Sequence, residues 1–205
     1  MYTRTLYATG DPAKMDGAVE VLSTAGHKLL ADQPGFRGLG VFVDRELGKV
    51  AVGTWWQDEQ SRDASDARLR EQRTSMLAPY VTTLATDNWE AAVFTRPSRP
   101  LAAGAGFRMG RLEFEPSDGD LLVETFKNMV VPKFQAIPGF EGTSLFIDRA
   151  RGRATVGVLY TDRKALAASR AAQAAVRGEA ITKARFTLRS VEEFELAFMV
   201  MPEMS

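Results

Sequence analysis

The chain contains two similar stretches about a hundred residues apart, and this internal repeat limits the folds that it can adopt. Residues 34–56 read PGFRGLGVFVDRELGKVAVGTWW, and residues 138–160 read PGFEGTSLFIDRARGRATVGVLY. At a constant spacing of 104, thirteen of the 32 positions in residues 34–65 are identical in the second copy, without a gap. This period is longer than the roughly 20 to 50 residues of a solenoid unit. The sequence therefore predicts two copies of one small domain.

Each copy shows the periodicity of the same elements in the same order. Alternating residues predict strands, and apolar residues at helical spacing predict helices. In the first copy these are a strand, a helix, a hairpin, a second helix and a closing strand, at residues 2–9, 11–35, 38–56, 57–77 and 88–95. The second copy repeats the order, with its second helix over 163–181. Pro132 falls inside its first helix, where we expect a kink or a break.

The order strand, helix, strand, strand, helix, strand is that of a ferredoxin-like unit. The fold class is therefore α+β, with two tandem ferredoxin-like repeats. Such a unit covers one face of its antiparallel sheet with helices and leaves an apolar face to be buried. Two copies in one chain predict that these faces are packed together. We place the first repeat at residues 1–95, a linker rich in Pro, Gly and Ala at 96–106, and the second repeat at 107–205.

Composition excludes several classes of function. Lys plus Arg and Asp plus Glu both number 26, so we expect neither a nucleic acid nor a membrane as partner. The chain has no cysteine and one histidine, which excludes thiolate chemistry and histidine-rich or cysteine-rich metal sites. We expect no metal and no cofactor. The start of the chain lacks the apolar core of a signal peptide, so we expect a cytoplasmic protein.

The stretch from Pro34-Gly35-Phe36 to Trp56, with the polar segment that follows, resembles the dimeric α+β barrel superfamily, in particular the antibiotic-biosynthesis-monooxygenase-like domains. Pro138-Gly139-Phe140 and Tyr160 match the same pattern, so the resemblance covers most of the chain. It implies a barrel of two sheets, here formed within one chain. Some members of the superfamily oxidise phenols or anthrones without a cofactor, some degrade haem, and others have no demonstrated chemistry. The haem-degrading members use a histidine in the second helix, and neither copy has one there.

Aromatic residues at the end of the hairpin are the first candidates for a ligand pocket. Trp56 matches the aromatic of the resembling family, and Tyr160 is its counterpart in the second copy. Either ring could form a pocket wall against which a flat substrate stacks, or could simply pack in the core. Trp55 points to the opposite face of the strand, and we expect it at the interface within the barrel.

Polar candidates are fewer. His27 lies beside the apolar stripe of the first helix and could serve as a general base, or could be a structural histidine. Tyr7 in the first strand and Asn128 in the first helix of the second copy could donate hydrogen bonds to a ligand. The paired Asp44-Arg45 and Asp148-Arg149 are explained by turn chemistry and surface ion pairs.

These features predict a cofactor-independent monooxygenase that acts on a small aromatic substrate such as a phenol or an anthrone. The alternative is a non-catalytic module that binds a small apolar or aromatic molecule, or an accessory barrel protein. Haem binding or degradation is a further alternative, which the missing helical histidine disfavours. Exposed faces could also support self-association, and the sequence does not fix the number of subunits.

Overall fold

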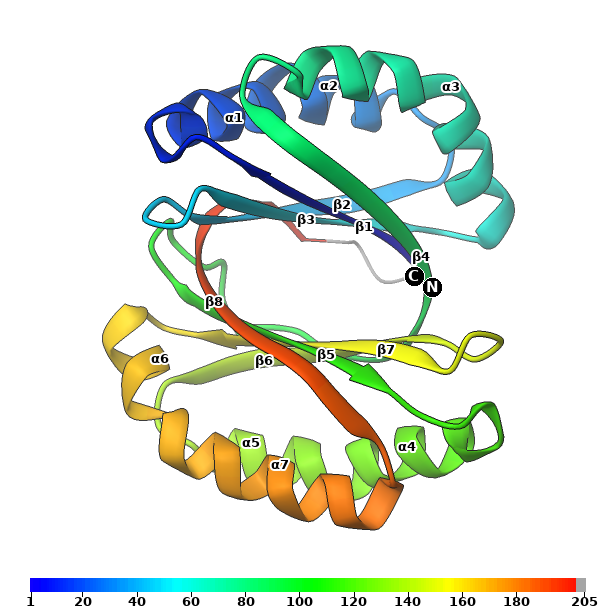
Figure 1. Cartoon of the computed structure of the whole chain (residues 1–205), viewed down its shortest axis with the longest axis vertical. Coiled ribbons are helices and arrows are strands. Elements are labelled where there is room, and N and C mark those ends of the chain that lie inside the picture. The colour runs from blue at the N-terminus through cyan, green and yellow to red at the C-terminus, as the bar shows by residue number, and fades with distance from the viewer. Residues whose placement is uncertain (202–205) are drawn as a thin grey trace. The chain divides into compact units, whose positions relative to one another are not determined.

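The structure is a computed structural model in which residues 1–201 are described, and the last part of the predicted second repeat, residues 202–205, lies outside them. The chain divides into two compact units. The first is Met1–Trp89 together with the chain from Leu196 onward, and the second is Glu90–Glu195. In each unit the helices cover one face of an antiparallel sheet (Figure 1).

The first copy has the predicted order of elements. They are β1 (Tyr2–Gly10), η1 (Pro12–Lys14), α1 (Met15–Val21), η2 (Leu22–Gly26), α2 (His27–Ala31), β2 (Phe36–Asp44), β3 (Lys49–Trp56), α3 (Glu59–Leu77) and β4 (Val81–Thr95). Strand β4 begins seven residues before its predicted start at residue 88. The extra residues are held to β1, where Thr82 Oγ1 donates to the Thr9 backbone oxygen at 3.1 Å.

The second copy repeats this order. Its elements are β5 (Gly106–Glu113), η3 (Pro116–Asp118), α4 (Gly119–Thr125), η4 (Phe126–Val130), α5 (Val131–Gln135), β6 (Phe140–Asp148), β7 (Arg153–Tyr160), α6 (Arg163–Ala168), α7 (Arg170–Ala184) and β8 (Thr187–Val200). The helix predicted over 163–181 is thus two helices that meet at Ser169. Residue Gly106, assigned to the linker from sequence, begins β5.

The eight strands hydrogen-bond in the closed order β1-β3-β2-β8-β5-β7-β6-β4. This confirms the α+β class, the tandem ferredoxin-like repeats and the barrel. Strands β4 and β8 each run from one compact unit into the other, so the units do not coincide with the sequence boundaries 1–95 and 107–205. The residues of β4 from Glu90 to Thr95 pair with β6 in the second unit.

The first helix of each copy contains a π-helical turn, η2 or η4, at equivalent positions. A kink or a break is expected at Pro132; the helix does not break there, since Pro132 lies in the first turn of α5 directly after η4, and the kink stays a prediction. Proline does not cause the wide turn, since Lys28 occupies the equivalent position after η2. A π turn often marks a functional site. Here both π turns contribute residues to a cavity, as described below.

Turn and cap residues explain why the same local structure forms twice. Asp58 and Asp162 cap the helices after the hairpins, each accepting a hydrogen bond at 2.7 Å from the backbone N–H three residues on. Asp44 and Asp148 accept backbone N–H groups within the hairpin turns. The flanking arginines form ion pairs, including Arg45 with Asp16 at 2.7 Å. These contacts agree with the interpretation of both Asp-Arg pairs as turn and surface chemistry.

Candidate functional site

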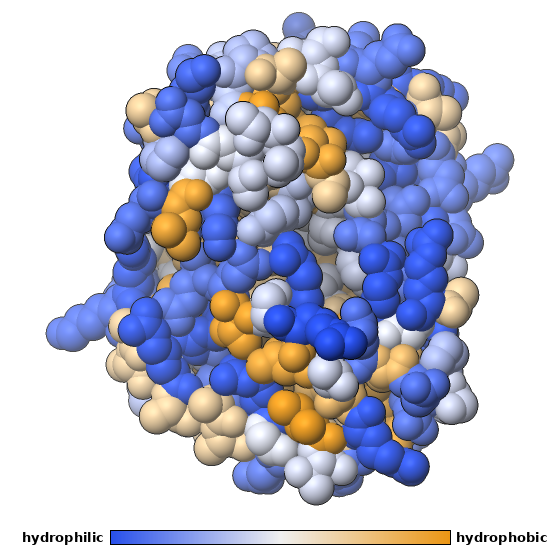
Figure 2. All heavy atoms as spheres, in the orientation of Figure 1, coloured by the Kyte–Doolittle hydropathy of each residue, from blue (hydrophilic) through white to orange (hydrophobic). Residues whose placement is uncertain are grey.

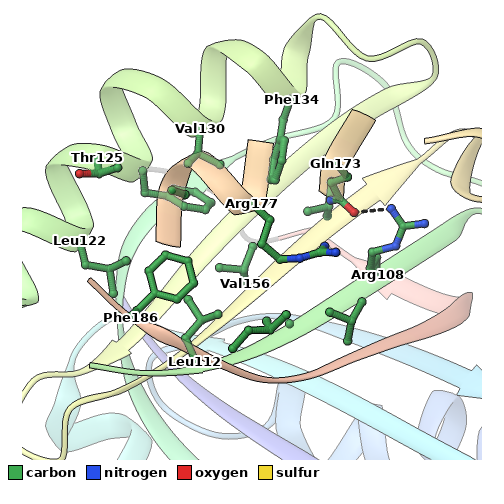
Figure 3. Close-up of a pocket in the computed structure, with 16 residues that line it drawn as sticks. Arg108, Leu112, Leu122, Thr125, Val130, Phe134, Val156, Gln173, Arg177 and Phe186 are labelled. Carbon is green, nitrogen blue, oxygen red and sulfur yellow. Dashed lines mark hydrogen bonds between the residues drawn. The ribbon is translucent and has the colours of Figure 1, made fainter. Parts of the chain in front are cut away.

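A cavity lies within the second unit, between the sheet and the helices, and the space between its lining residues, part of it open to solvent, is about 560 Å³. Its walls are mainly apolar, and the π turn η4 contributes Phe126 and Val130. Figure 3 shows Phe134, Phe186 and Leu122 around this space. Val191 also lines the cavity and is one of the exposed large apolar residues of the described chain. Figure 2 shows such apolar side chains at the surface among charged ones.

Arg108 supplies a cation at the edge of this cavity and is held by a dense set of hydrogen bonds. It comes from β5 and is only 4% exposed. Its guanidinium donates to the backbone oxygen of Leu166 at 2.7 Å, to Ser169 Oγ at 2.9 Å and to Glu193 Oε1 at 2.6 Å. It also donates to Gln173 Oε1, a contact drawn in Figure 3. These partners fix the side chain in place.

Arg177 is a second cation of the cavity, and it differs from Arg108 in its hydrogen bonds and ion pairs. Figure 3 shows its guanidinium extending from α7 into the cavity, toward the side where Arg108 and Gln173 lie. Within residues 1–201 it makes no hydrogen bond and no ion pair. Burial lowers the pKa of Arg177, and the neighbouring positive charge of Arg108 lowers it further. The cavity therefore holds a half-buried positive charge without a protein counter-ion in the described chain.

The first unit contains an equivalent cavity, in which the space between the lining residues, part of it open to solvent, is about 580 Å³. Its arginine is Arg4, which stands 104 residues before Arg108 and makes matching contacts. The Arg4 guanidinium donates to the backbone oxygen of Arg62 at 2.7 Å and to Ser65 Oγ at 3.0 Å. Burial lowers the pKa of Arg4 to about 10, although Asp66 nearby opposes this shift. The two copies thus conserve one buried arginine in one setting.

The two cavities differ in their balance of charge. In the first, Arg73 donates to Asp66 Oδ1 at 2.8 Å, and Asp66 also lies 3.7 Å from Arg4. The position equivalent to Asp66 in the second copy is Arg170. Arg170 instead binds Glu193 at 2.6 Å, so the arginine equivalent to Arg73 is left without that carboxylate. The arginine of the first cavity therefore has a carboxylate partner, whereas Arg177 in the second has none among the described residues.

The aromatic residues predicted from sequence lie close to this arrangement. Trp56 is fully buried, donates through Nε1 to Thr54 Oγ1 at 3.0 Å, and meets Phe36 edge to face. Tyr160 is equally buried, with the Arg108 guanidinium 5.9 Å from its ring centre. Burial raises the pKa of the Tyr160 phenol, with Ser169 and Arg108 opposing. Neither ring lines these two cavities, so their role as pocket walls stays a prediction.

The other predicted residues lie elsewhere. His27 contacts the rings of Phe36 and Phe198, at centroid distances of 6.3 and 5.4 Å. Trp55 is buried, and Asn128 is exposed in η4. Tyr7 is partly exposed and alternates along β1 with Arg4 and Leu6, which line the first cavity. None of these four residues lines the two cavities, and their roles also remain predictions.

Sequence reasoning missed the arginines, although a signal was present. Arg4 and Arg108 are retained at the repeat spacing, as are Arg73 and Arg177. The alternation of β1 also places Arg4 on the same strand face as Leu6, where a buried side chain is expected. A cation on an apolar face that is kept in both copies indicates a buried polar network.

Other kinds of site find less support in the described residues. Within residues 1–201 there is no group of three or more acidic or histidine side chains that could hold a metal ion. None of the described helices combines the length and apolar character needed to cross a bilayer. His, Asp and Glu side chains are also absent from the described lining of both cavities. The polar chemistry of the second cavity is therefore that of its arginines and of a few neutral groups.

Comparisons with known proteins agree with this fold. No protein-family profile matches the sequence. The Mycobacterium tuberculosis protein named "Uncharacterized protein Rv2557" is 27% identical over 168 residues, which are 82% of this chain and 75% of that protein. The crystal structure of an anthrone oxidase-like protein matches with a TM-score of 0.71 at 11% identity, over 98% of this chain and 92% of that chain.

A second solved structure comes from Listeria monocytogenes 4b F2365 and is described as a ferredoxin-fold protein related to antibiotic biosynthesis monooxygenases. It matches with a TM-score of 0.54 at 6% identity, over 98% of this chain and 95% of that chain. At such identities the similarity shows the fold alone. The chain has the dimeric α+β barrel fold of monooxygenase-like proteins, as the sequence resemblance predicted.

Proposed function

We propose that this chain is a cofactor-independent monooxygenase that oxidises a small aromatic substrate in the cavity of the second unit. The observation that carries the proposal is a mainly apolar pocket with two arginines on one side. Its apolar lining suits a hydrophobic molecule. The likeness in fold to an anthrone oxidase-like protein supports the same class of substrate.

The chemistry needs a substrate that is itself the reductant. A phenol or an enolised anthrone loses a proton to give an electron-rich anion, and the guanidinium groups of Arg108 and Arg177 favour that anion by lowering the pKa of the bound substrate. For an anthrone, the methylene carbon loses two hydrogens and gains one oxygen atom from dioxygen. The other oxygen atom leaves as water, so four electrons pass from carbon to oxygen and no external reductant is required.

A matched pair of variants tests this proposal. Ala180 lines the second cavity, and Met76 is its counterpart in the first. An A180W side chain fills the second cavity, whereas M76W fills the first. We expect oxygen uptake with anthrone, together with formation of the quinone chromophore, in the wild type and in M76W but not in A180W. Equal rates in A180W and the wild type would place the reaction outside this cavity.

A second candidate function is binding without catalysis. The absence of a carboxylate or histidine from the described lining of the cavity favours it, because no side chain there is an ordinary general base. Saturable binding of anthrone to the wild type, lost in A180W and unaccompanied by oxygen uptake at any pH from 6 to about 9, would establish the non-catalytic module instead.

A further inference from the structure

We infer that the second cavity takes its ligand as an anion, an aromatic molecule with one carboxylate or similarly charged oxygen group that binds Arg177, and that the first cavity does not. This inference deepens the proposed function and rests on the same cavity. It concerns the charge of the ligand and the inequality of the two repeats, neither of which follows from the fold.

Arg177 has no partner among the described residues. Its guanidinium points into the cavity and has neither a hydrogen bond nor an ion pair within residues 1–201 (Figure 3). Glu179, two residues further along α7, binds Lys133 instead. A guanidinium removed from bulk water without a partner is costly. An anionic ligand would supply the missing counter-ion and hydrogen-bond acceptors.

The other arginines beside the second cavity already bind protein groups. Glu193 supplies the carboxylate on this side of the second unit, and both Arg108 and Arg170 already bind it. The side chain of Arg108 is saturated by its four partners. Arg177 therefore remains as the group that is free to bind a ligand. The apolar walls opposite it require that the remainder of that ligand be hydrophobic.

The first repeat offers an internal comparison for Arg177. Arg73 stands where Arg177 stands, in an equivalent cavity, but its counter-ion is already present in the protein. Asp66 accepts from Arg73 at 2.8 Å and from Arg70, and both Arg73 and Asp66 are largely buried. An anion entering this cavity would meet a neutralised arginine and the carboxylate of Asp66. The replacement of Asp66 by Arg170 in the second copy is thus the change that creates an anion site.

The test compares a charged and a neutral ligand of the same shape. Calorimetric titration of the full chain with 2-naphthoate and with 2-naphthamide should show that the carboxylate binds at least about tenfold more tightly, because a charge-assisted hydrogen bond in a partly buried site is strong. Binding should involve one site per chain. Equal affinities for the two ligands in the wild type would overturn the inference.

Variants assign the preference to one residue. In R177M we expect the advantage of naphthoate over naphthamide to disappear, while R177K should retain part of it and serves as a second variant if R177M folds poorly. The repeat-matched control R73M should bind naphthoate as the wild type does. A naphthoate preference that survives in R177M, or is lost in R73M instead, would contradict the assignment to Arg177.

A gain of function provides the converse test. The D66N substitution removes the charge that neutralises Arg73, so we expect a second naphthoate site per chain in that variant. A stoichiometry that stays at one would count against the charge argument. These outcomes are separable from catalysis. Preferential naphthoate binding without oxygen uptake would uphold the anion site and refute the monooxygenase, whereas oxygen uptake with no preference for naphthoate would do the reverse.

Discussion

At the scale of single residues, the two repeats keep one buried arginine and change its surroundings. Arg4 and Arg108 each donate to a serine hydroxyl and to a backbone oxygen of the helix that follows the hairpin, with matching partners. Such groups are costly to bury and persist only when their hydrogen-bonding groups are satisfied. The arginine therefore ties strand to helix in each unit, and the residues around it determine what the cavity accepts.

Replacing Arg108 with methionine should show that a buried arginine stabilises the fold more than an exposed arginine does. R108M leaves Gln173 Oε1 without its donor and removes one donor each from Glu193 and the backbone oxygen of Leu166, so we expect the free energy of unfolding to fall by about 2–3 kcal/mol. R170M is the control, because Arg170 binds the same carboxylate but is 65% exposed. Urea denaturation should show the larger loss for R108M. Equal losses in the two variants would contradict the argument from burial.

Part of this arrangement could be predicted from the sequence. The spacing of 104 pairs Arg4 with Arg108 and Asp66 with Arg170, so the retained cation and the lost carboxylate are both visible in the alignment. The cavities are not, because an empty space depends on how side chains from several elements fill it. The prediction therefore centred on aromatic residues such as Trp56, which is fully buried and does not line either of the two cavities described here.

At the scale of elements, local sequence signals predicted the hairpins well and the helices less well. The hairpin turns contain Gly48 and Gly152, both with positive φ, and aspartates that accept backbone N–H groups. These signals act over a few residues and can be recognised in sequence. The π turns could not, because neither copy has a glycine–proline or other local signal common to both turns, and Pro132 has Lys28 as its counterpart after the first one.

The role of the turn glycine can be tested with alanine. Gly152 has φ of +61°, and a Cβ there would collide with the backbone oxygen of Phe114, so G152A should lower the free energy of unfolding by at least about 1–2 kcal/mol. Gly178 is the control, because a Cβ at this position of α7 meets no atom within 4 Å. G178A should raise stability by about 0.5–1 kcal/mol. Thermal denaturation that showed shifts of the same sign would refute this account.

At the scale of the whole molecule, the chain is not two independent repeats joined by a linker. Strand β4 leaves the first unit at Trp89 and pairs with β6 in the second, and β8 enters the first unit at Leu196. Ala197 and Phe198 pack against the core of the first unit, and Val93 belongs to the core of the second. The repeat was visible in the sequence, but this exchange was not, because neighbouring repeats that fold separately would show the same periodicity.

The exchange of strands predicts how fragments of the chain behave. A fragment of residues 1–95 keeps the segment of β4 after Trp89 without its partner β6, and it lacks Phe198 from its own core. A fragment of residues 96–205 lacks Val93 and the pairing of β6 with β4. We therefore expect neither fragment to give a folded monomer, because each loses apolar burial and a row of backbone hydrogen bonds.

Mixing the two fragments should restore the missing strand pairing and core contacts, since each fragment carries the strand segment that the other lacks. Circular dichroism of the mixture should recover the signal of the intact chain with a cooperative thermal transition, and light scattering should give the mass of a one-to-one complex. In the control, the fragment of residues 1–95 is mixed with a second fragment that ends at residue 195. This shorter fragment lacks the β8 segment that enters the first unit. A cooperative transition from either fragment as a monomer would show that the repeats fold independently, and that the crossing strands add no more than a connection.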